Sequence, residues 1–245
     1  MSGRIVVFPN YEGRESVSGE FSRRIRTAVG GVHIVAAING VDSADEADVD
    51  VEHVYSTPGF NAAVLAGLAR AVEPGALVAR IDTNEHDRGK LPMAFSLLES
   101  ADMAVLDMVF DETTLRAGSA EEYHTKFVIP QIISFATGQR WTLSGCHGFM
   151  VFRGEALARI LPIVVEALRI ANGVEEMAGR AAVTWSADTL LPIVADRLGM
   201  VIKIVPQDAV EFRDNESEKC ALQAWDLQCL LHALDKILPG RHVVS

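Results

Sequence analysis

Short apolar segments alternate with helical patterns along the first 110 residues, and this alternation limits the possible folds more than any other feature of the sequence. Aliphatic and β-branched runs predict strands, and apolar residues at helical spacing predict the helices between them. The strands are expected at 4–8, 32–38, 51–55, 76–81 and 103–110, and the helices at 16–29, 60–72 and 90–100. Because parallel strands need long crossovers, the pattern predicts an α/β fold with a doubly wound, mostly parallel central sheet and helices on both faces.

The length and composition favour one large domain followed by a helical tail. The chain has 245 residues, 49% of them hydrophobic, and no linker-like stretch divides its middle. We expect a main domain at residues 1–206 and a helical extension at 207–245 that packs on the core or on a partner subunit of a dimer. Its broad apolar face is expected to contain Leu222, Trp225, Leu230, Leu231, Leu234 and Ile237.

The charge and the cysteines restrict the partners and the compartment. A formal net charge of −11 disfavours nucleic acid and anionic membranes as partners. Cys146, Cys220 and Cys229 have neither an even count nor metal-ligand spacing, which indicates free thiols in a reducing compartment. No apolar segment is long enough to span a bilayer, and the start lacks a signal-peptide core. These features predict a soluble, cytoplasmic protein.

A cluster of oxygen-bearing side chains follows the strand expected at 76–81, in the stretch A-L-V-A-R-I-D-T-N-E-H-D. The cluster consists of Asp82, Asn84, Glu85 and Asp87. Carboxylates this close repel one another unless solvent, a base or a cation separates them. In such sheets ligands bind beyond the carboxyl ends of the strands, so this cluster is a candidate site. A helix N-cap role for Asp82 and a turn role for Asn84 remain alternatives.

Three common phosphate or nucleophile motifs are absent from the sequence. There is no G-x-G-x-x-G after the first strand, no G-x-x-x-x-G-K-[ST] and no G-x-S-x-G. A glycine-rich phosphate cradle is therefore disfavoured. A divalent cation is the usual alternative for neutralising a diphosphate, because it takes oxygen ligands from carboxylates and phosphates together.

Four segments resemble, in order, the inverting nucleotide-sugar glycosyltransferases of the GT-A fold, especially the family-two group around dolichol-phosphate mannosyltransferases. They are I-V-V-F-P-N-Y-E at 5–12, A-A-I-N-G-V-D-S-A-D at 36–45, the helix and strand end at 60–84 closing on A-R-I-D-T-N, and L-S-G-C-H-G-F-M-V-F-R-G-E-A-L at 143–157 followed by W-S-A-D-T-L-L-P at 185–192. The resemblance covers residues 4–206. It implies a GT-A-like fold and transfer of a sugar from a nucleotide diphosphate-sugar to an acceptor.

The resemblance also implies which residues bind the nucleotide. Pro9, Tyr11 and Glu12 would line the base and the ribose. Asn39 stands where the family usually has an aspartate facing the base. Asp82, as the first residue of the family's D-x-D motif, would touch the ribose.

The same resemblance implies a metal and a catalytic base. Asp82 and Asn84 would hold Mn²⁺ or Mg²⁺ on the diphosphate, and Asp188 would be the base or anchor the acceptor. The family commonly has an aspartate at the position of Asn84, a stronger ligand that Glu85 or Asp87 would replace. On this basis an Asp82→Ala change is expected to abolish metal-dependent nucleotide binding with little change in melting temperature. A helix-capping role for Asp188 remains an alternative.

Three further residues are candidates for substrate binding. His147 lies between small residues in S-G-C-H-G, with a buried histidine as the alternative. Arg153 is expected to meet a phosphate or to pair with an acid such as Glu155. Trp185 is expected to stack on the sugar or the acceptor, although aromatic side chains more often belong to the core.

The expected chemistry has two parts, stabilisation of the departing diphosphate and removal of a proton from the acceptor hydroxyl. Inversion needs one base and no covalent intermediate. Two other functions fit less of the sequence. A sugar nucleotidyltransferase usually has a basic G-G-x-G-x-R loop where this chain has P-N-Y-E-G-R at 9–14. A non-catalytic binding or scaffold protein would explain Asn84 and the S-A-D sequence at 186–188, where the family usually has an E-D pair.

Overall fold

A computed structural model describes residues 3–11, 15–40, 51–57, 59–82, 87–106, 148–206 and 217–239. The described residues of Met1–Val105, Gly148–Pro162 and Val201–Val205 form one compact unit, and those of Leu106–His147, Ile163–Met200 and Pro206–Ser245 form a second. The second unit contains residues on both sides of the boundary that the sequence suggested at 206. A separate role for the C-terminal extension stays a prediction.

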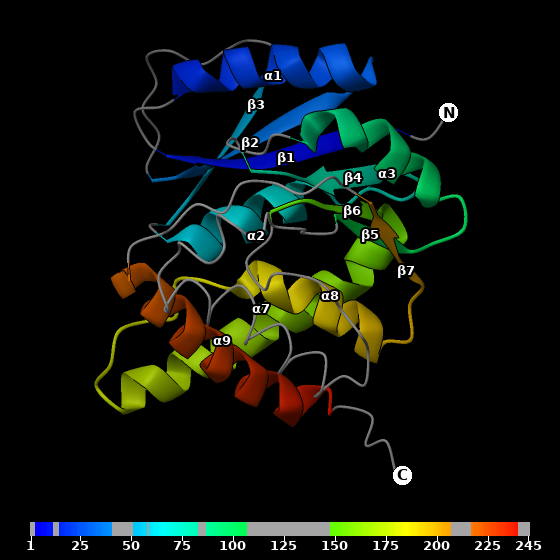
Figure 1. The fold of residues 1–245 in the computed structure, drawn as a ribbon. Coiled ribbons are helices and arrows are strands. Elements are labelled where there is room, and N and C mark those ends of the chain that lie inside the picture. Colours follow the sequence, from blue (N-terminus) through cyan, green and yellow to red (C-terminus); the bar gives the residue numbers. More distant parts are fainter. Residues whose placement is uncertain are drawn as a thin grey trace, which may run out of the picture. The chain divides into compact units, whose positions relative to one another are not determined.

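Within the described residues, seven strands form one sheet in the order β3-β2-β1-β4-β6-β5-β7 (Figure 1). The strands are β1 (Arg4–Tyr11), β2 (His33–Asn39), β3 (Glu52–Ser56), β4 (Leu77–Arg80), β5 (Met103–Leu106), β6 (Met150–Arg153) and β7 (Ile202–Val205). The strands β3, β2, β1 and β4 are parallel, whereas β6 is antiparallel to both β4 and β5. The predicted α/β class with a mostly parallel sheet is confirmed.

The first strand is longer than the sequence suggested, because the strand expected at 4–8 continues through Pro9 and Asn10. β1 continues to Tyr11, which pairs with Asn39 of β2. Proline is tolerated here because the ladder with β4 already ends at Val7. The carbonyl of Val7 accepts a hydrogen bond from the N–H of Ile81, directly after β4. Because residues two apart in a strand direct their backbone groups to the same side, the backbone of Pro9 also faces β4, but beyond the end of that ladder.

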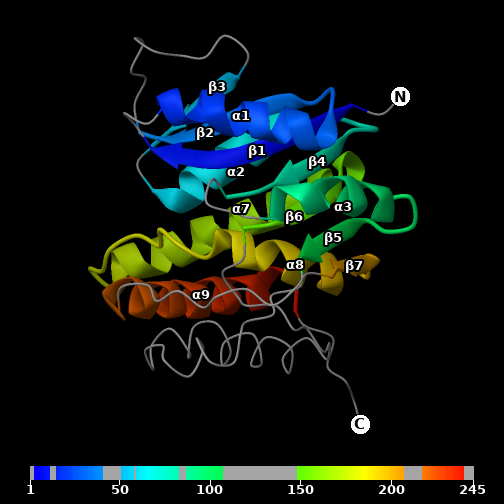
Figure 2. The same ribbon diagram turned by 45° about the horizontal axis from the view of Figure 1, so that its top comes forward.

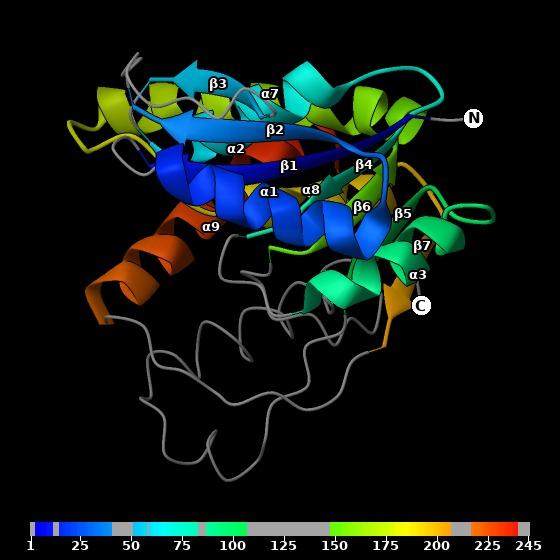
Figure 3. The same cartoon turned by 90° about the horizontal axis from the view of Figure 1, so that it is seen from above.

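Helices cover both faces of the sheet in the first unit. Figures 1 and 3 show α1 (Glu15–Val29) and α3 (Leu91–Leu97) over one face and α2 (Phe60–Ala71) over the other. A 3-10 helix, η1 (Asp87–Lys90), leads directly into α3. The central strands are therefore buried on both sides, which explains their continuous apolar runs instead of an alternating pattern.

The helix α2 packs closely on the sheet because Gly67 has no side chain. A Cβ atom at Gly67 would lie 2.7 Å from side-chain atoms of both Ala37 and Val7. Buried residues of α2, among them Leu68 and Ala71, complete this contact. This close packing holds α2 against the sheet, with its first turn at the carboxyl edge of the parallel strands.

The second unit is helical in the part that the structure describes. It contains most of α7 (Gly154–Met177), with α8 (Ala187–Arg197) and α9 (Ser217–Ile237) (Figure 2). Arg197 ties α8 to α9, because its Nη1 atom donates to the carbonyl of Leu238 at 2.7 Å and pairs with Asp235 at 2.7 Å. None of the helices that the structure describes is long and apolar enough to cross a membrane.

The apolar face expected on the tail helix is only partly buried. Leu230 and Leu234 are fully buried, as predicted. Leu222 and Trp225 are each 48% exposed and Ile237 is 36% exposed, so the predicted face is broader than the one that packs. Packing against a partner subunit stays a prediction.

Candidate functional site

The ends of the parallel strands bring several candidate residues to one edge of the sheet. The register pairs Tyr11 of β1 with Asn39 of β2, and Asn39 with Ser56 of β3. The strand β4 is shorter and ends at Arg80, two residues before Asp82. Because β1, β2, β3 and β4 are parallel, their carboxyl ends lie at one edge of the sheet.

Asn39 has a structural task at this edge. Its side-chain oxygen accepts a hydrogen bond from the backbone N–H of Gly59 at 2.7 Å, immediately before α2 begins. The same side chain therefore connects the end of β2 with the start of α2. A contact of its amide nitrogen with a nucleotide base remains a proposal.

Asp82 is held by a buried arginine. The Nη2 atom of Arg80 lies 3.0 Å from Oδ1 of Asp82, and the arginine side chain is fully buried while that of Asp82 is 29% exposed. The guanidinium also lies over the ring of Phe60, 5.6 Å from its centroid. A buried charge requires a partner of opposite sign, so the pair fixes the Asp82 carboxylate at the edge with part of its surface free for a ligand.

This ion pair changes the stability expected for variants of Asp82. Removal of one partner from a buried pair costs about 3–5 kcal/mol, and the partial exposure of Asp82 reduces that amount. Asp82→Ala is therefore expected to lower the melting temperature, contrary to the expectation from the sequence. A test of ligand binding needs a substitution that keeps a side-chain oxygen near Arg80.

Gly148 completes the surroundings of the ion pair. A Cβ atom at this position would lie 2.1 Å from Oδ2 of Asp82 and 2.2 Å from Nη1 of Arg80. These distances are far below van der Waals contact, and the buried guanidinium has little room to move. Glycine is therefore the only residue that fits at position 148 beside this arrangement of Arg80 and Asp82.

Gly148→Ala is expected to destabilise the fold by about 1–3 kcal/mol and to weaken binding of any ligand of Asp82, because the added methyl group displaces the ion pair. Denaturant unfolding and nucleotide titration measure the two effects. Gly31→Ala is the matched control, since a Cβ atom there has no neighbour within 4 Å. Wild-type stability and binding in Gly148→Ala would show that Asp82 does not lie against this glycine.

The residues present fit a hard divalent cation in one respect. Asp82 offers a partly exposed carboxylate, and such cations are commonly held by one or two carboxylates together with substrate phosphates. Among the residues that the structure describes, no group of three His, Cys, Asp or Glu side chains is arranged to hold a metal. Asn84 and Glu85 lie outside the described residues, as does the side chain of Asp87.

Other predicted site residues also fall outside the described part of the chain. These are Glu12 and His147, together with the side chain of Tyr11. Their roles stay predictions. Pro9 is described and lies in the last part of β1, at a half-buried position.

Arg153 does not belong to this site. It pairs with Leu77 at the start of β4, so it lies at the opposite edge of the sheet from Asp82. Its guanidinium donates to the carbonyl oxygens of Leu98, Glu99 and Ala101 at 2.7–3.0 Å, just after α3 ends. The side chain therefore satisfies exposed carbonyls at a helix end, and a contact of Arg153 with a phosphate stays a prediction.

Glu155, the acid that the sequence suggested as a partner of Arg153, also binds a backbone group. The carboxylate of Glu155 accepts a hydrogen bond from the backbone N–H of Gly75 at 2.7 Å. Hydrogen bonds from its own N–H and from that of Gly75 lower the pKa of Glu155, and the charge of Arg153 lowers it further. Both side chains stabilise connections between elements of the first unit.

Asp188 and Trp185 belong to the second unit. Asp188 is in the first turn of α8, is 5% exposed, and accepts a hydrogen bond at Oδ1 from the N–H of Thr189 at 3.0 Å. The N-cap of α8 is Ser186, so Asp188 does not cap the helix, although it satisfies one N–H of the first turn. A carboxylate at this position also interacts favourably with the helix dipole. The role of Asp188 as base and that of Trp185 in stacking stay proposals.

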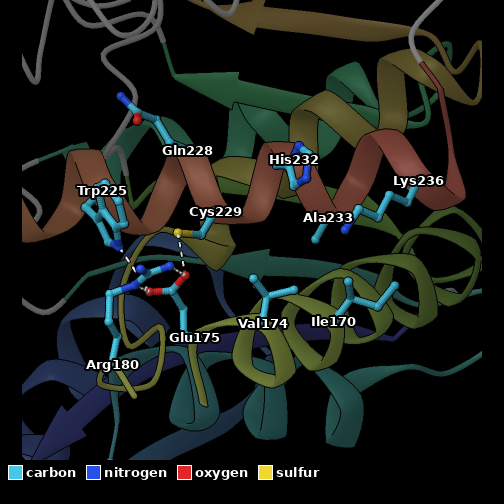
Figure 4. A pocket seen from close by; sticks show the side chains of 11 residues that line it. Ile170, Val174, Glu175, Arg180, Trp225, Gln228, Cys229, His232, Ala233 and Lys236 are labelled. Atoms are coloured by element: carbon cyan, nitrogen blue, oxygen red, sulfur yellow. Dashed lines mark hydrogen bonds and ion pairs between the residues drawn. The ribbon is translucent and has the colours of Figure 1, made fainter. Parts of the chain in front are cut away.

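A second set of polar groups joins α7 to α9 beside a hollow of about 230 Å³ (Figure 4). Glu175 accepts two hydrogen bonds from Arg180, at 2.6 and 2.8 Å, one from Trp225 at 3.4 Å and one from the thiol of Cys229 at 3.6 Å. The Arg180 bonds lower the pKa of Glu175 to about 2, against the opposite effect of burial. Burial, followed by the charge of Glu175, raises the pKa of Cys229 to about 11, which lowers the fraction of thiolate at neutral pH.

The lowered pKa of Glu175 predicts an acid-sensitive contribution to stability. A carboxyl whose pKa is lower in the folded protein stabilises the fold above its ordinary value of 4.5, and this contribution disappears as the pH falls toward about 2. The unfolding free energy of wild type is therefore expected to approach that of Glu175→Gln over this range. Denaturant unfolding at several pH values measures the difference.

Glu166→Gln is the matched control for Glu175→Gln, because Glu166 pairs with Arg169 on the surface of the same helix. An exposed pair contributes little, so this variant should follow the wild-type curve closely. If the unfolding free energies of wild type and Glu175→Gln instead differ by a constant amount between about pH 6 and about pH 2, the stabilisation does not come from Glu175.

Sequence reasoning missed the residues that hold others in place. The clearest is Arg80, a charged residue inside the apolar stretch A-L-V-A-R-I. A charge at a buried strand position requires a nearby acid, and the adjacent acidic cluster was the available signal. Asp226 on α9 is a second example, and it gave no sequence signal because its partners lie 41 and 42 residues away.

The sheet order and the helices on both faces define an α/β GT-A-like fold, and solved structures share it. A mycobacterial protein has a TM-score of 0.61 at 15% identity, covering 95% of this chain and 75% of that one. Glucosyl-3-phosphoglycerate synthase from Mycobacterium tuberculosis, solved with Mn²⁺, UDP and glucosyl-3-phosphoglycerate, has a TM-score of 0.58 at 15% identity, covering 95% and 80%. Mannosyl-3-phosphoglycerate synthase from Rubrobacter xylanophilus has a TM-score of 0.58 at 11% identity, covering 100% and 77%.

No family model matches the chain, and no curated protein matches it. Identities of 11–15% establish a common fold and leave the ligands as properties of those neighbours. The GT-A-like fold that the sequence motifs implied is confirmed.

Proposed function

We propose that this protein is a glycosyltransferase that transfers a sugar from a nucleotide diphosphate-sugar to an acceptor with a divalent cation. The observation that carries the proposal is the Asp82 carboxylate, which is fixed by a buried arginine yet 29% exposed, at the carboxyl end of a parallel strand. Ligands bind at this edge in open α/β sheets. Neighbours of the same fold were solved with Mn²⁺ and UDP-glucose or UDP, which supports the choice of ligand class.

The residues divide the work as follows. Asp82, with Asn84, would hold the cation, which supplies Lewis-acid stabilisation of the leaving diphosphate when it is bound. Pro9, Tyr11, Glu12 and Asn39 would contact the nucleotide. Arg80 keeps the carboxylate of Asp82 in position and balances its charge before the ligand arrives.

Asp188 is the proposed general base, and the transfer is proposed to proceed with inversion. The carboxylate would remove the proton of the acceptor hydroxyl while the acceptor oxygen attacks the sugar carbon. Such a transfer needs no covalent intermediate between the sugar and the enzyme. His147 and Trp185 are proposed contacts for the sugar or the acceptor. Trp185 lies just before α8 and Asp188 lies in its first turn, so one short segment would supply both the base and a contact for the sugar or the acceptor.

The donor and the acceptor define the finer proposal. Two neighbours are named as synthases that form glycosyl-3-phosphoglycerate, and one was solved with UDP-glucose and phosphoglyceric acid. UDP-glucose and phosphoglyceric acid are therefore the first pair to test. A lipid phosphate, the acceptor class of the dolichol-phosphate mannosyltransferases that the sequence motifs resemble, is the second.

Calorimetric titration with UDP and GDP, each with and without Mn²⁺ or Mg²⁺, tests the proposal. Binding of one nucleotide only when metal is present is the expected result. Absence of binding by either nucleotide in folded protein would overturn it and favour the non-catalytic scaffold. Turnover separates the remaining alternatives, because transfer releases nucleoside diphosphate and a nucleotidyltransferase releases pyrophosphate.

A further inference from the structure

The segment at 180–186 connects α7 to α8 without forming a helix or strand, yet a buried carboxylate holds its backbone. Oδ2 of Asp226, on α9, accepts hydrogen bonds from two consecutive peptide N–H groups, those of Thr184 at 2.9 Å and Trp185 at 2.8 Å. Asp226 is only 5% exposed. Burial raises its pKa, and the two N–H groups oppose this shift.

Side chains of α7 hold the earlier part of the same segment. Oδ1 of Asn172 accepts a hydrogen bond from the N–H of Val183 at 2.8 Å. Arg180 is fixed to Glu175 by two hydrogen bonds, and its guanidinium lies over the ring of Trp225, 5.5 Å from the centroid (Figure 4). The segment is therefore tied to α7 and α9 at its start and along its backbone.

Ser186 fixes the last residue before α8. It has a φ angle of 69°, in the left-handed region that non-glycine residues seldom adopt. Its side chain is buried, and its hydroxyl donates to the carbonyl of Gln223 on α9 at 3.0 Å. The backbone thus enters α8 in one direction, set by a contact with α9.

These contacts exceed what a connector between two helices needs. A solvated loop satisfies its N–H groups with water at no burial cost, whereas here a carboxylate is withdrawn from solvent to accept two of them. A serine holds a backbone conformation that costs about 1 kcal/mol, which glycine would adopt freely. The residues fixed in this way are Thr184, Trp185 and Ser186, which immediately precede Ala187 and Asp188.

We propose that Asp226 is a positioning residue for the reaction: it fixes the peptide groups of Thr184 and Trp185 so that the first turn of α8 presents Asp188 in one orientation. Asp226 acts through this backbone and touches no substrate. The inference rests on the proposed role of Asp188. It adds a helix-α9 residue to the machinery, one that no motif in the sequence indicates.

Asp226→Ala and Asp226→Asn test the inference in the full-length protein. The alanine variant lacks the acceptor, so we expect a drop in the rate constant for UDP release of on the order of 10-fold or more, with UDP–Mn²⁺ affinity unchanged. The asparagine variant keeps a side-chain oxygen for the two N–H groups and is expected to recover most of the rate. The probe is UDP-glucose with phosphoglyceric acid and Mn²⁺.

Two further variants make the result independent of folding. Ser186→Gly loses the hydroxyl bond to Gln223 but relieves the left-handed conformation, so its stability should stay near that of wild type while its rate falls. Gln228→Ala is the matched control, because this side chain lies on the same helix and is exposed. The control is expected to keep the wild-type rate.

Amide hydrogen exchange at Thr184 and Trp185 measures the contact itself without turnover. Faster exchange in Asp226→Ala together with a lower rate constant supports the inference. Unchanged exchange, or faster exchange with a wild-type rate constant, overturns it. If wild type binds neither UDP nor GDP with Mn²⁺ and releases neither from a donor, the proposed function fails and this inference fails with it, whatever the exchange data show.

Discussion

Asp188→Asn is expected to reduce release of nucleoside diphosphate from the donor by on the order of 10²-fold or more, with donor affinity unchanged. The amide has nearly the shape of the carboxylate but cannot take a proton from the acceptor hydroxyl. It retains an oxygen for the N–H of Thr189, which Asp188 now accepts at 3.0 Å, so α8 should begin as in wild type. Rates of UDP release from UDP-glucose and calorimetric nucleotide affinity give the two quantities.

Asp196→Asn is the matched control for this variant, because it removes the same charge from the other end of α8. It should keep the wild-type rate. An Asp188→Asn enzyme with the wild-type rate would show that the base lies elsewhere, and the carboxylate of Asp188 would then serve only the start of the helix.

Asp82→Asn is expected to remove metal-dependent nucleotide binding and to leave any metal-independent binding in place. The substitution keeps an oxygen near Arg80 but removes the negative charge that a hard cation requires. Calorimetric titration with UDP, in the presence and absence of Mn²⁺, measures the loss directly. The melting temperature of the variant reports how much of the ion pair with Arg80 an amide oxygen replaces.

Asp102→Asn provides the comparison in the same unit. Asp102 precedes β5 and accepts a hydrogen bond from the N–H of Val201 at 2.9 Å, away from the carboxyl ends of β1, β2 and β4. It should bind nucleotide and metal as wild type does. Full metal dependence in Asp82→Asn would refute the role of Asp82 as ligand and make the ion pair with Arg80 a purely structural feature.

The two carboxylates differ in what surrounds them, and this difference explains the choice of variants. Asp82 balances a fully buried cation, so removal of its side chain affects both stability and binding. Asp188 is itself buried and bonds to a neighbouring N–H of its own helix. In both cases an asparagine separates the loss of charge from the loss of a contact, whereas an alanine would combine the two effects.

The sequence by itself determined the class of fold. Strand and helix patterns depend on residues close together in the chain, and they located most of the elements in the first unit to within a few residues. The exception, the end of β1, arose because Pro9 normally ends a strand, and only the short ladder of β4 makes it acceptable there. The acidic end of β4 was also evident, since Asp82 directly follows an apolar run.

The tertiary structure alone decided which side chains hold the candidate site together. Gly148 meets Asp82 across 66 residues of sequence, and Asp226 meets Thr184 across 42. Arg153 lies beside the end of α3, away from Asp82, because β6 runs antiparallel to β4, a direction that no local pattern contains. Local propensity sets the elements, but the partner of a buried charge depends on which distant segments the sheet and the helices bring into contact.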